Sequence, residues 1–247
     1  MSINHAITTT SAEQFRRQGL GMPVTEVDGG PSEGVDRREW MASRGARHRL
    51  YLRLAKPVFD MLAAALLLIV LSPLWFGTAV AVIASMGRPV IFSQQRVGRG
   101  GKVFRIYKFR TMLADRRRSL TVYSDGDRRV YHKSSRDPRH TRIGLWLRKW
   151  SLDELPQLLN VLRGDMSLVG PRPEVVEVVN RYETWQHGRH VVKPGLTGMW
   201  QVIARGEGPM HEHASLDLAY VERCSLALDF QILLQTIPTV LGRRPGA

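Results

Sequence analysis

The chain has 247 residues, 43% of them apolar, so it is long enough for a sizeable core and is not disordered as a whole. Its single cysteine, Cys224, excludes an intramolecular disulfide and fits a reducing compartment. A formal charge of +14 ordinarily favours nucleic acid as a partner, so the distribution of the charge decides its meaning.

The basic residues gather in two windows. Residues 44–56 hold five cations and residues 88–110 hold seven, and neither window contains an Asp or a Glu. Outside them 24 cations face 22 acids, so the rest of the chain is nearly neutral. Nucleic-acid binding needs a basic face on a soluble domain, whereas here the excess flanks an apolar segment. The distribution therefore favours a membrane surface over nucleic acid.

Residues 1–43 precede the first basic window. They are rich in Thr, Ser, Gly and charge and show no sustained periodicity. This composition predicts a disordered N-terminal tail without chemistry of its own.

An uncharged stretch of 27 residues, Met61–Gly87, lies between the two basic windows. About 20 apolar residues suffice to cross a bilayer, but Ser72-Pro73 interrupts the stretch, and a proline bends a helix at the preceding turn. Ser72 can return a side-chain hydrogen bond to the backbone there. Because cations favour the cytoplasmic side and stand on both flanks, we expect a re-entrant helical hairpin with arms Met61–Leu71 and Leu74–Met86. A kinked single span and a buried core helix are the alternatives.

Two short segments after the apolar stretch are typical of strands, Pro89–Arg96 and Lys102–Arg110, joined by Gly98-Arg-Gly-Gly101. A hairpin turn explains these glycines better than a phosphate-binding loop does. Residues 113–140 are polar and irregular and suit a surface loop that could close over a substrate. Helical patterns follow at about 142–150, 154–163, 173–187 and 215–240. The predicted fold class is α+β, mostly helical, with one small β-hairpin.

The stretch from residue 150 to residue 173 contains the strongest candidates for catalytic residues. It places adjacent carboxylates, Asp153 and Glu154, between Arg148 and Arg172. Anionic catalytic groups and phosphate-binding cations could converge there, as phosphoryl transfer requires.

A structural explanation competes with this one. Ser151, followed three residues later by Glu154, fits a capping box that opens an amphipathic helix. Adjacent residues on a helix also point about 100° apart, so Asp153 and Glu154 share one face only at an irregular first turn. The stretch alone does not decide between capping and catalysis.

Five motifs stand in one order along the chain after the broken apolar stretch. They are Lys108-Phe-Arg-Thr-Met112, Asp137-Pro-Arg139, Ser151-Leu-Asp-Glu-Leu-Pro-Gln-Leu158, Gly170-Pro-Arg-Pro173 and Pro194-Gly-Leu-Thr-Gly198. With them the chain resembles the bacterial sugar transferases, which are monotopic polyprenyl-phosphate phosphoglycosyl transferases. The resemblance covers residues 50–241. It is to the compact form of the family, without the four extra N-terminal membrane helices of the longer members.

The resemblance implies transfer of a sugar phosphate from a UDP-sugar to undecaprenyl phosphate, with release of UMP. This is the first committed step of surface polysaccharide or glycoconjugate assembly. By motif position, Asp153 would be the nucleophile that forms a covalent phosphosugar, and Glu154 would join it in holding Mg²⁺. Arg148 and Arg172 match cations that bind the substrate phosphates.

Three further residues match the family less directly. Lys108 and Arg110 belong to a basic motif that would touch the donor phosphates or anionic lipid. Asp217 matches a position associated with the active site, although an aspartate on a helix surface explains it nearly as well.

The expected organisation has three parts: a tail over 1–43, a basic juxtamembrane and re-entrant helix over 44–88, and a cytosolic interfacial catalytic domain over 89–247. The expected partners are undecaprenyl phosphate and anionic phospholipid at the cytosolic face of the inner membrane, and a nucleotide sugar. No nucleic acid is expected, and a homodimer is compatible with this organisation. The alternative to an enzyme is a non-catalytic, basic, membrane-anchored scaffold. No stretch of residues specifies the sugar.

Overall fold

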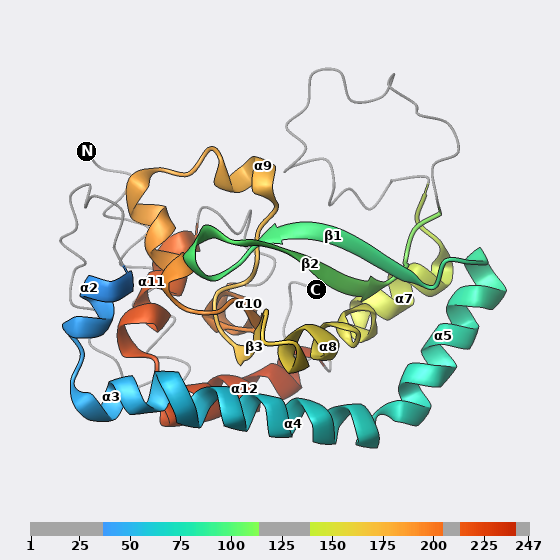
Figure 1. Ribbon diagram of the computed structural model, residues 1–247. Helices are drawn as coiled ribbons and strands as arrows, with labels where there is room; N and C mark the ends of the chain where they lie inside the picture. The colour runs from blue at the N-terminus through green and yellow to red at the C-terminus, as the bar shows by residue number, and fades with distance from the viewer. Residues whose placement is uncertain (1–36, 114–138, 205–212, 241–247) are drawn as a thin grey trace.

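The computed structural model describes residues 37–113, 139–204 and 213–240, which form a mostly helical α+β fold with two small sheets (Figure 1). The predicted fold class is confirmed at this level. The predicted surface loop over 113–140 falls almost wholly outside the described residues, and so does Asp137 of the second motif.

The first described segment corrects the predicted end of the tail. Residues Arg37–Ala42 form helix α2, and its Trp40 and Met41 are buried in the main core. Regular structure therefore begins before residue 43, because two large apolar side chains give this short helix a surface to pack on. Residues 1–36 of the predicted tail lie outside the described residues.

A bent pair of apolar helices follows (Figure 1). Its elements are α3 (Ala46–Leu50), η1 (Tyr51–Ala55), α4 (Lys56–Val70) and α5 (Ser72–Met86). The axis turns by 64° between α4 and α5. As predicted, Pro73 stands in the first turn of α5, and the Ser72 hydroxyl donates a hydrogen bond to the Ile69 carbonyl at 2.8 Å.

The exposure of this helix pair argues against the buried core helix. Leu62, Ile69 and Phe76 are 67%, 72% and 69% exposed, and a core helix would cover such side chains. Within the described residues no single helix is long and apolar enough to cross a membrane, whereas the bent pair meets that test of length and composition when taken together.

The predicted β-hairpin is confirmed. Strands β1 (Ile91–Val97) and β2 (Val103–Phe109) pair antiparallel, from Ile91 opposite Phe109 to Val97 opposite Val103. The short turn η2 (Arg99–Gly101) joins them, and Gly100 and Gly101 have φ of 66° and 74°. Glycine adopts positive φ without steric cost, so these glycines serve the turn.

The helices of the second half follow the prediction in part. Helix α7 (Arg142–Lys149) matches its predicted span, whereas α8 (Gln157–Leu162) begins three residues later than predicted. The predicted helix over 173–187 is wrong, because only the short α9 (Val176–Val179) and the 3₁₀ segment η4 (Thr184–Val191) form there. Pro173 and the extended residues Val175 and Glu183 interrupt the helical pattern.

The predicted helix over 215–240 is two helices, α11 (Ala214–Arg223) and α12 (Leu226–Val240). Cys224 has φ −50° and ψ 122°, which ends α11, and its side chain is fully buried. The Ser225 hydroxyl then accepts a hydrogen bond from the Leu228 amide at 3.3 Å and so caps α12.

A parallel pair of short strands, which the sequence did not predict, lies in the main core. Strands β3 (Ser167–Val169) and β4 (Gly195–Thr197) pair with Ser167 beside Gly195 and Val169 beside Thr197. The Gly170 amide donates to the Thr197 carbonyl at 2.9 Å, and the Gly195 amide to the Pro171 carbonyl at 2.9 Å. The fourth and fifth motifs therefore lie side by side.

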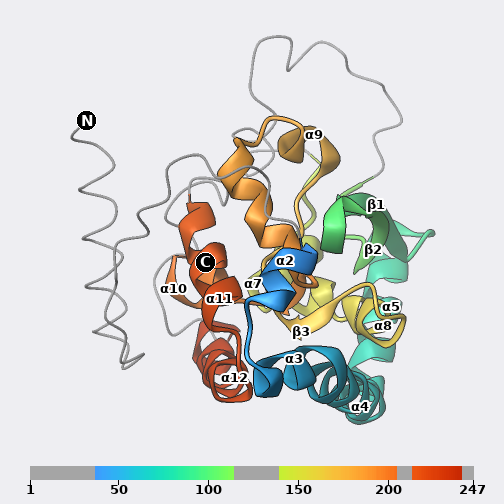
Figure 2. The ribbon, with the colours of Figure 1, turned by 60° about the vertical axis from the view of Figure 1, so that its left-hand side comes forward.

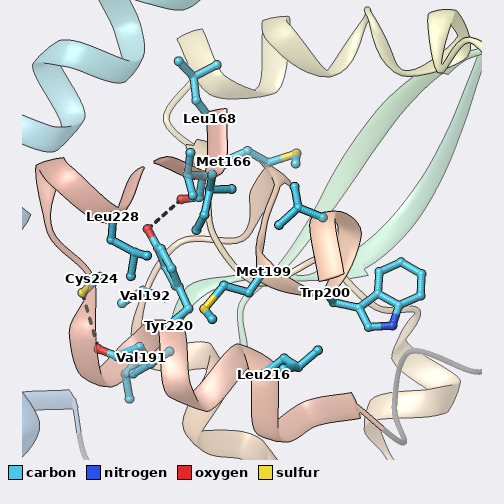
Figure 3. Close-up of a cluster of buried hydrophobic side chains, with 14 of the residues drawn as sticks. Met166, Leu168, Val191, Val192, Met199, Trp200, Leu216, Tyr220, Cys224 and Leu228 are labelled. Carbon is cyan, nitrogen blue, oxygen red and sulfur yellow. Dashed lines mark hydrogen bonds between the residues drawn. The ribbon is translucent and has the colours of Figure 1, made fainter. Parts of the chain in front are cut away.

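The main core packs around this strand pair. Figure 3 shows Tyr220 reaching from α11 toward β3, where its hydroxyl oxygen lies 3.1 Å from the Val169 carbonyl oxygen. Met166, Leu168 and Met199, the last on α10 (Met199–Ile203), lie in the same cluster. Strand β3 is thus wholly buried, and β4 is buried except at the partly exposed Leu196.

A buried polar network holds α4 against this core. Asp229 of α12 accepts hydrogen bonds from Lys56 Nζ and, at 2.7 Å, from the Tyr220 hydroxyl. Asp60 of α4 accepts from the Ser167 hydroxyl at 2.6 Å. Both carboxylates are almost fully buried, so the network fixes α4 beside α12 and β3, along the lower edge of both views (Figure 1, Figure 2).

The close approach of β3 and β4 predicts an effect of substitution at Gly195. A Cβ atom there would lie 2.1 Å from the Gly170 nitrogen and 2.4 Å from the Thr197 oxygen, so the strands would have to separate. We expect Gly195→Ala to cost on the order of 3 kcal/mol and to lower the melting temperature in detergent.

Gly77→Ala in α5 is the matched control. A Cβ at Gly77 meets no atom within 4 Å, and alanine favours a helix over glycine by about 0.5–1 kcal/mol. Its melting temperature should equal or exceed that of the wild type. Equal melting temperatures for the two variants would contradict the packing of β3 on β4.

Candidate active site

A tight turn between α7 and α8 carries the two acids. Ser151 has φ 54°, in the left-handed region, and the 3₁₀ turn η3 (Leu152–Glu154) follows it. Such a conformation costs a non-glycine residue on the order of 1 kcal/mol, so the surrounding packing must hold it. The predicted capping box is wrong, because the Ser151 side chain makes no capping hydrogen bond. The acids lie on an irregular turn rather than inside a regular helix.

Apolar residues on both sides of the acids anchor this turn. Leu152 and Leu155 pack against a second apolar cluster built on Val82 of α5, Phe109 of β2 and Leu147 of α7. The acids are therefore fixed to one arm of the bent helix pair as well as to β2 and α7.

Glu154 is bound by two cations. Its Oε1 lies 2.7 Å from Lys108 Nζ and 2.6 Å from Arg172 Nη2, and Arg172 Nη1 contacts Oε2 at 3.4 Å. Burial alone would raise the pKa of Glu154, but the charges of Arg172 and then Lys108 outweigh it and hold that pKa well below its ordinary value. Glu154 is therefore ionised and fixed in place at neutral pH.

Asp153 differs from Glu154 in its partners and in the direction of its pKa shift. It is 8% exposed, and within the described part of the chain no side chain donates a hydrogen bond to its carboxylate. Burial first, and then the negative charge of Glu154, raise its pKa to about 6, against the pull of Lys108, Arg148 and Arg172. A carboxylate that ionises near neutrality and is not tied into an ion pair is available to attack a substrate.

Two residues predicted to bind substrate phosphate, Arg148 and Arg110, lie in different surroundings. Arg148 lies close enough to favour the charge of Asp153, and its Nε donates to the Thr111 hydroxyl at 2.9 Å. Arg110 is 8% exposed and donates to the carbonyls that end α5, among them those of Met86 and, at 2.5 Å, Gly87. Arg110 thus satisfies a helix end, whereas Lys108, two residues earlier, reaches the acids.

A buried arginine that the sequence did not single out supports Arg172. The guanidinium of Arg189 donates to the Arg172 carbonyl at 2.6 Å and pairs with Asp217 Oδ2 at 2.5 Å. Both partners of this ion pair are 1% exposed, and burial raises the pKa of Asp217 to about 6 although Arg189 opposes the shift. Among the described residues, Asp217 is linked to Arg172 through Arg189 and makes no direct contact with the two acids.

Three other supports also escaped prediction. Asn160 of α8 donates to the Arg105 carbonyl at 2.7 Å and accepts from the Tyr107 amide at 3.1 Å, which fixes β2 against the helix after the acids. Thr111 and His140 contact Arg148. No spacing rule marks such residues, because their partners are distant in sequence or belong to the backbone.

The carboxylates of the site could hold a metal ion if substrate phosphates supplied further ligands. In residues 37–113, 139–204 and 213–240, no group of three His, Cys, Asp or Glu side chains could hold an ion. Mg²⁺ commonly takes one or two carboxylates and completes its shell with water and substrate phosphates. The Asp153 carboxylate and the loosely held Oε2 of Glu154 fit that requirement.

The sequence matches a known family over most of its length. Residues 51–243 match the bacterial sugar transferase family. The chain belongs to this family. The resemblance drawn from the five motifs is confirmed, and the acids, Lys108, Arg148 and Arg172 all lie within the matched residues.

Three relatives illustrate the range of similarity. The exopolysaccharide production protein ExoY of Sinorhizobium fredii is 39% identical over 193 residues, which are 76% of this chain and 85% of that protein. The undecaprenyl-phosphate galactose phosphotransferase of Salmonella typhimurium is 42% identical over 205 residues, 79% of this chain and 42% of that protein. The UDP-glucose:undecaprenyl-phosphate glucose-1-phosphate transferase of Xanthomonas campestris pv. campestris is 41% identical over 202 residues, 78% of this chain and 40% of that protein. The chain thus spans most of the first relative and less than half of the other two.

The two acids should respond oppositely to neutralisation. The pKa of Asp153 is raised from 3.8 to about 6, so its ionisation costs stability as pH rises through that window. Asp153→Asn removes the cost, and we expect it to stabilise the protein by on the order of 1–3 kcal/mol near pH 7.5 and by little near pH 4.

Glu154→Gln should have the opposite effect. The pKa of Glu154 is lowered, so its charge contributes stability at neutral pH, and its loss leaves Lys108 and Arg172 without their acid. We expect a loss on the order of 3 kcal/mol near pH 7.5. Thermal unfolding in detergent across pH measures both variants, and shifts of the same sign at neutral pH would contradict the assignment.

Proposed function

We propose that the protein transfers a sugar 1-phosphate from a UDP-sugar to undecaprenyl phosphate and releases UMP, as a step in polysaccharide synthesis. The observation that carries the proposal is the buried Asp153, which lacks an ion-pair partner among the described residues while Glu154 beside it pairs with both Lys108 and Arg172. Membership of the family supports it, and so do the names of the Salmonella and Xanthomonas relatives, which both specify undecaprenyl phosphate.

The first half of the reaction forms a covalent enzyme. An Asp153 carboxylate oxygen bonds to the sugar-bearing phosphorus of the donor, and the bond from that phosphorus to the bridging oxygen breaks. UMP leaves with the electron pair. Arg172 and Lys108 lie where they can offset the negative charge that a diphosphate brings to two carboxylates.

The second half restores the enzyme. A phosphate oxygen of undecaprenyl phosphate bonds to the same phosphorus, the bond to Asp153 breaks, and the carboxylate is regenerated. The product is an undecaprenyl-diphosphate sugar. The first attack needs an Asp153 oxygen free of a fixed hydrogen-bond partner, which agrees with its state in this structure.

Mg²⁺ is the proposed cofactor. Asp153 and Glu154 would hold it together with the donor phosphates, and when bound it would neutralise charge on the diphosphate and its leaving group. The protein's own cations, Lys108, Arg148 and Arg172, supply the remaining positive charge around the acids.

The proposed location is the cytosolic face of the inner membrane. The acceptor chain stays in the bilayer whereas a nucleotide sugar is soluble, so the reaction belongs at the interface. The bent pair of α4 and α5, with exposed apolar side chains and cations on both flanks, suits a re-entrant hairpin that enters and leaves on that face. Cations near the surface would also bind anionic phospholipid, at about 1 kcal/mol each.

The reaction is tested with purified protein, Mg²⁺, undecaprenyl phosphate and a panel of UDP-sugars, with UMP release as the readout. The panel is needed because the two named relatives differ in their sugar, galactose in one and glucose in the other. We expect one or more donors to yield UMP, and Asp153→Asn to reduce the rate on the order of 10³-fold or more. Incubation of the wild type with the active donor alone should add the mass of a sugar phosphate to the intact protein.

Asp165→Asn is the control, because Asp165 is a partly exposed acid in the turn after α8, away from the ion pairs of Glu154. It should release UMP at the wild-type rate. A chain that yields no UMP from any donor is a membrane scaffold rather than a transferase. Full activity of Asp153→Asn would instead refute the nucleophile while leaving the transfer reaction standing.

A further inference from the structure

A small pocket of about 30 Å³ lies at the N-terminal end of α4. Trp40 and Met41 of α2, Leu52 of η1 and Pro57 of α4 form apolar walls. The pocket takes one compact group and has no room for a sugar or a nucleotide. None of the residues that bind Glu154 lines it.

Three cations from separate elements meet at this pocket: Arg37 of α2, Arg99 of η2 and Lys193 after η4. Within the described residues none of the three has an ion-pair partner. Burial and then the charge of Arg37 lower the pKa of Arg99, and burial and then the charge of Arg99 lower that of Lys193. The three charges therefore repel one another across the pocket.

The acids nearby do not neutralise this cluster. Asp60 lines the pocket, but its Oδ2 accepts from the Ser167 hydroxyl at 2.6 Å and its Oδ1 from the Leu168 amide at 3.2 Å. Lys56, also in the wall, is bound to Asp229. Asp60 and then Asp165 lie near enough to favour the charge of Lys193, but neither forms an ion pair with it in the described structure. Asp60 and Lys56 are thus bound within the buried polar network, whereas Arg37, Arg99 and Lys193 have no ion-pair partner among the described residues.

The pocket lies far from the acids of the active site. Arg99 stands at the turn of the β-hairpin, whereas Lys108, which binds Glu154, pairs with Phe92 near the open end of the hairpin. Five residues of extended strand plus the turn separate the two, a length of about 20 Å. An anion held at Arg99 is therefore not the diphosphate at Asp153.

We propose that Arg37, Arg99 and Lys193 form a second anion site, which binds the phosphate group of a lipid headgroup or free phosphate. Three donors of positive charge around a compact pocket match a tetrahedral oxyanion. Leu50, Leu54 and Val58 of the same helical segment are 59%, 60% and 55% exposed, on roughly the opposite side from the pocket-lining Leu52, Lys56 and Asp60. A lipid headgroup whose phosphate bound the cations would thus have exposed apolar side chains within one helical turn. This site does not depend on the proposed transfer reaction.

The first test measures melting temperature in detergent with inorganic phosphate, against chloride at equal ionic strength so that simple screening cancels. The variant is Arg99→Gln with Lys193→Gln. The matched control is Lys102→Gln with Arg105→Gln, two exposed cations of the same hairpin outside the pocket. Phosphate that binds at Arg172 contributes equally to all three proteins.

We expect phosphate to raise the melting temperature of the wild type and of the control, and to raise that of the pocket variant by roughly half as much or less. In chloride, without phosphate, we expect the melting temperature of the pocket variant to equal or exceed that of the wild type, because two mutually repelling charges are gone. A structural role for these cations would lower the stability of the variant in both salts.

The second test separates the two sources of phosphate. The same proteins are floated with vesicles of phosphatidylcholine, or of equal parts phosphatidylcholine and phosphatidylglycerol. A lipid headgroup predicts that the pocket variant loses roughly twofold or more of its preference for phosphatidylglycerol, while the control keeps it. Free phosphate predicts a response in the melting test alone. If the pocket variant matches the control in both tests, the site does not exist.

Discussion

Two cations bind Glu154 at once, and the arrangement of the site depends on this ion pairing. Lys108 comes from β2 and Arg172 from the loop after β3, so Glu154 joins two distant segments to the turn that carries it. Because Glu154 satisfies these cations, Asp153 keeps no fixed partner although it lies among the same charges. Beyond burial, the negative charge of Glu154 itself raises the pKa of Asp153, whereas the charges of Lys108 and Arg172 lower it. One carboxylate thus supplies the fixed charge, and its neighbour remains available for chemistry.

The two arms of the bent helix pair are fixed to different parts of the molecule. Buried hydrogen bonds to Asp60 and Asp229 hold α4 on the main core. The other arm, α5, packs through Val82 on the second cluster, and Arg110 binds the carbonyls at its end. The same cluster holds the leucines on either side of the acids. Ser72 and Pro73 permit the bend, but these two attachments fix its angle and with it the position of the acids relative to the two arms.

Local patterns predicted the local elements of the fold. The hairpin, helix α7 and the bend at Ser72 depend on residues within a few positions of one another, and all three are confirmed. The parallel pair of β3 and β4 escaped prediction because each strand has three residues, too few for a period, and its partner is distant in sequence. The error over 173–187 also comes from distant contacts. A helical pattern of side chains cannot reveal that the Glu174 carbonyl accepts a hydrogen bond from the Val97 amide of β1 or that Val175 is extended.

The candidate site was predictable in its members and not in their roles. Five motifs in order identify the acids and their cations, but adjacent carboxylates are chemically alike in a sequence. What distinguishes them is which one the cations reach, and that depends on the register of β2 and on the position of the Arg172 loop, which Arg189 and Asp217 support from behind. The same register places Lys108 at the acids and leaves Arg110 at the end of α5. A basic motif can therefore be matched residue by residue although one of its two cations pairs with an acid of the candidate site and the other binds the backbone at a helix end.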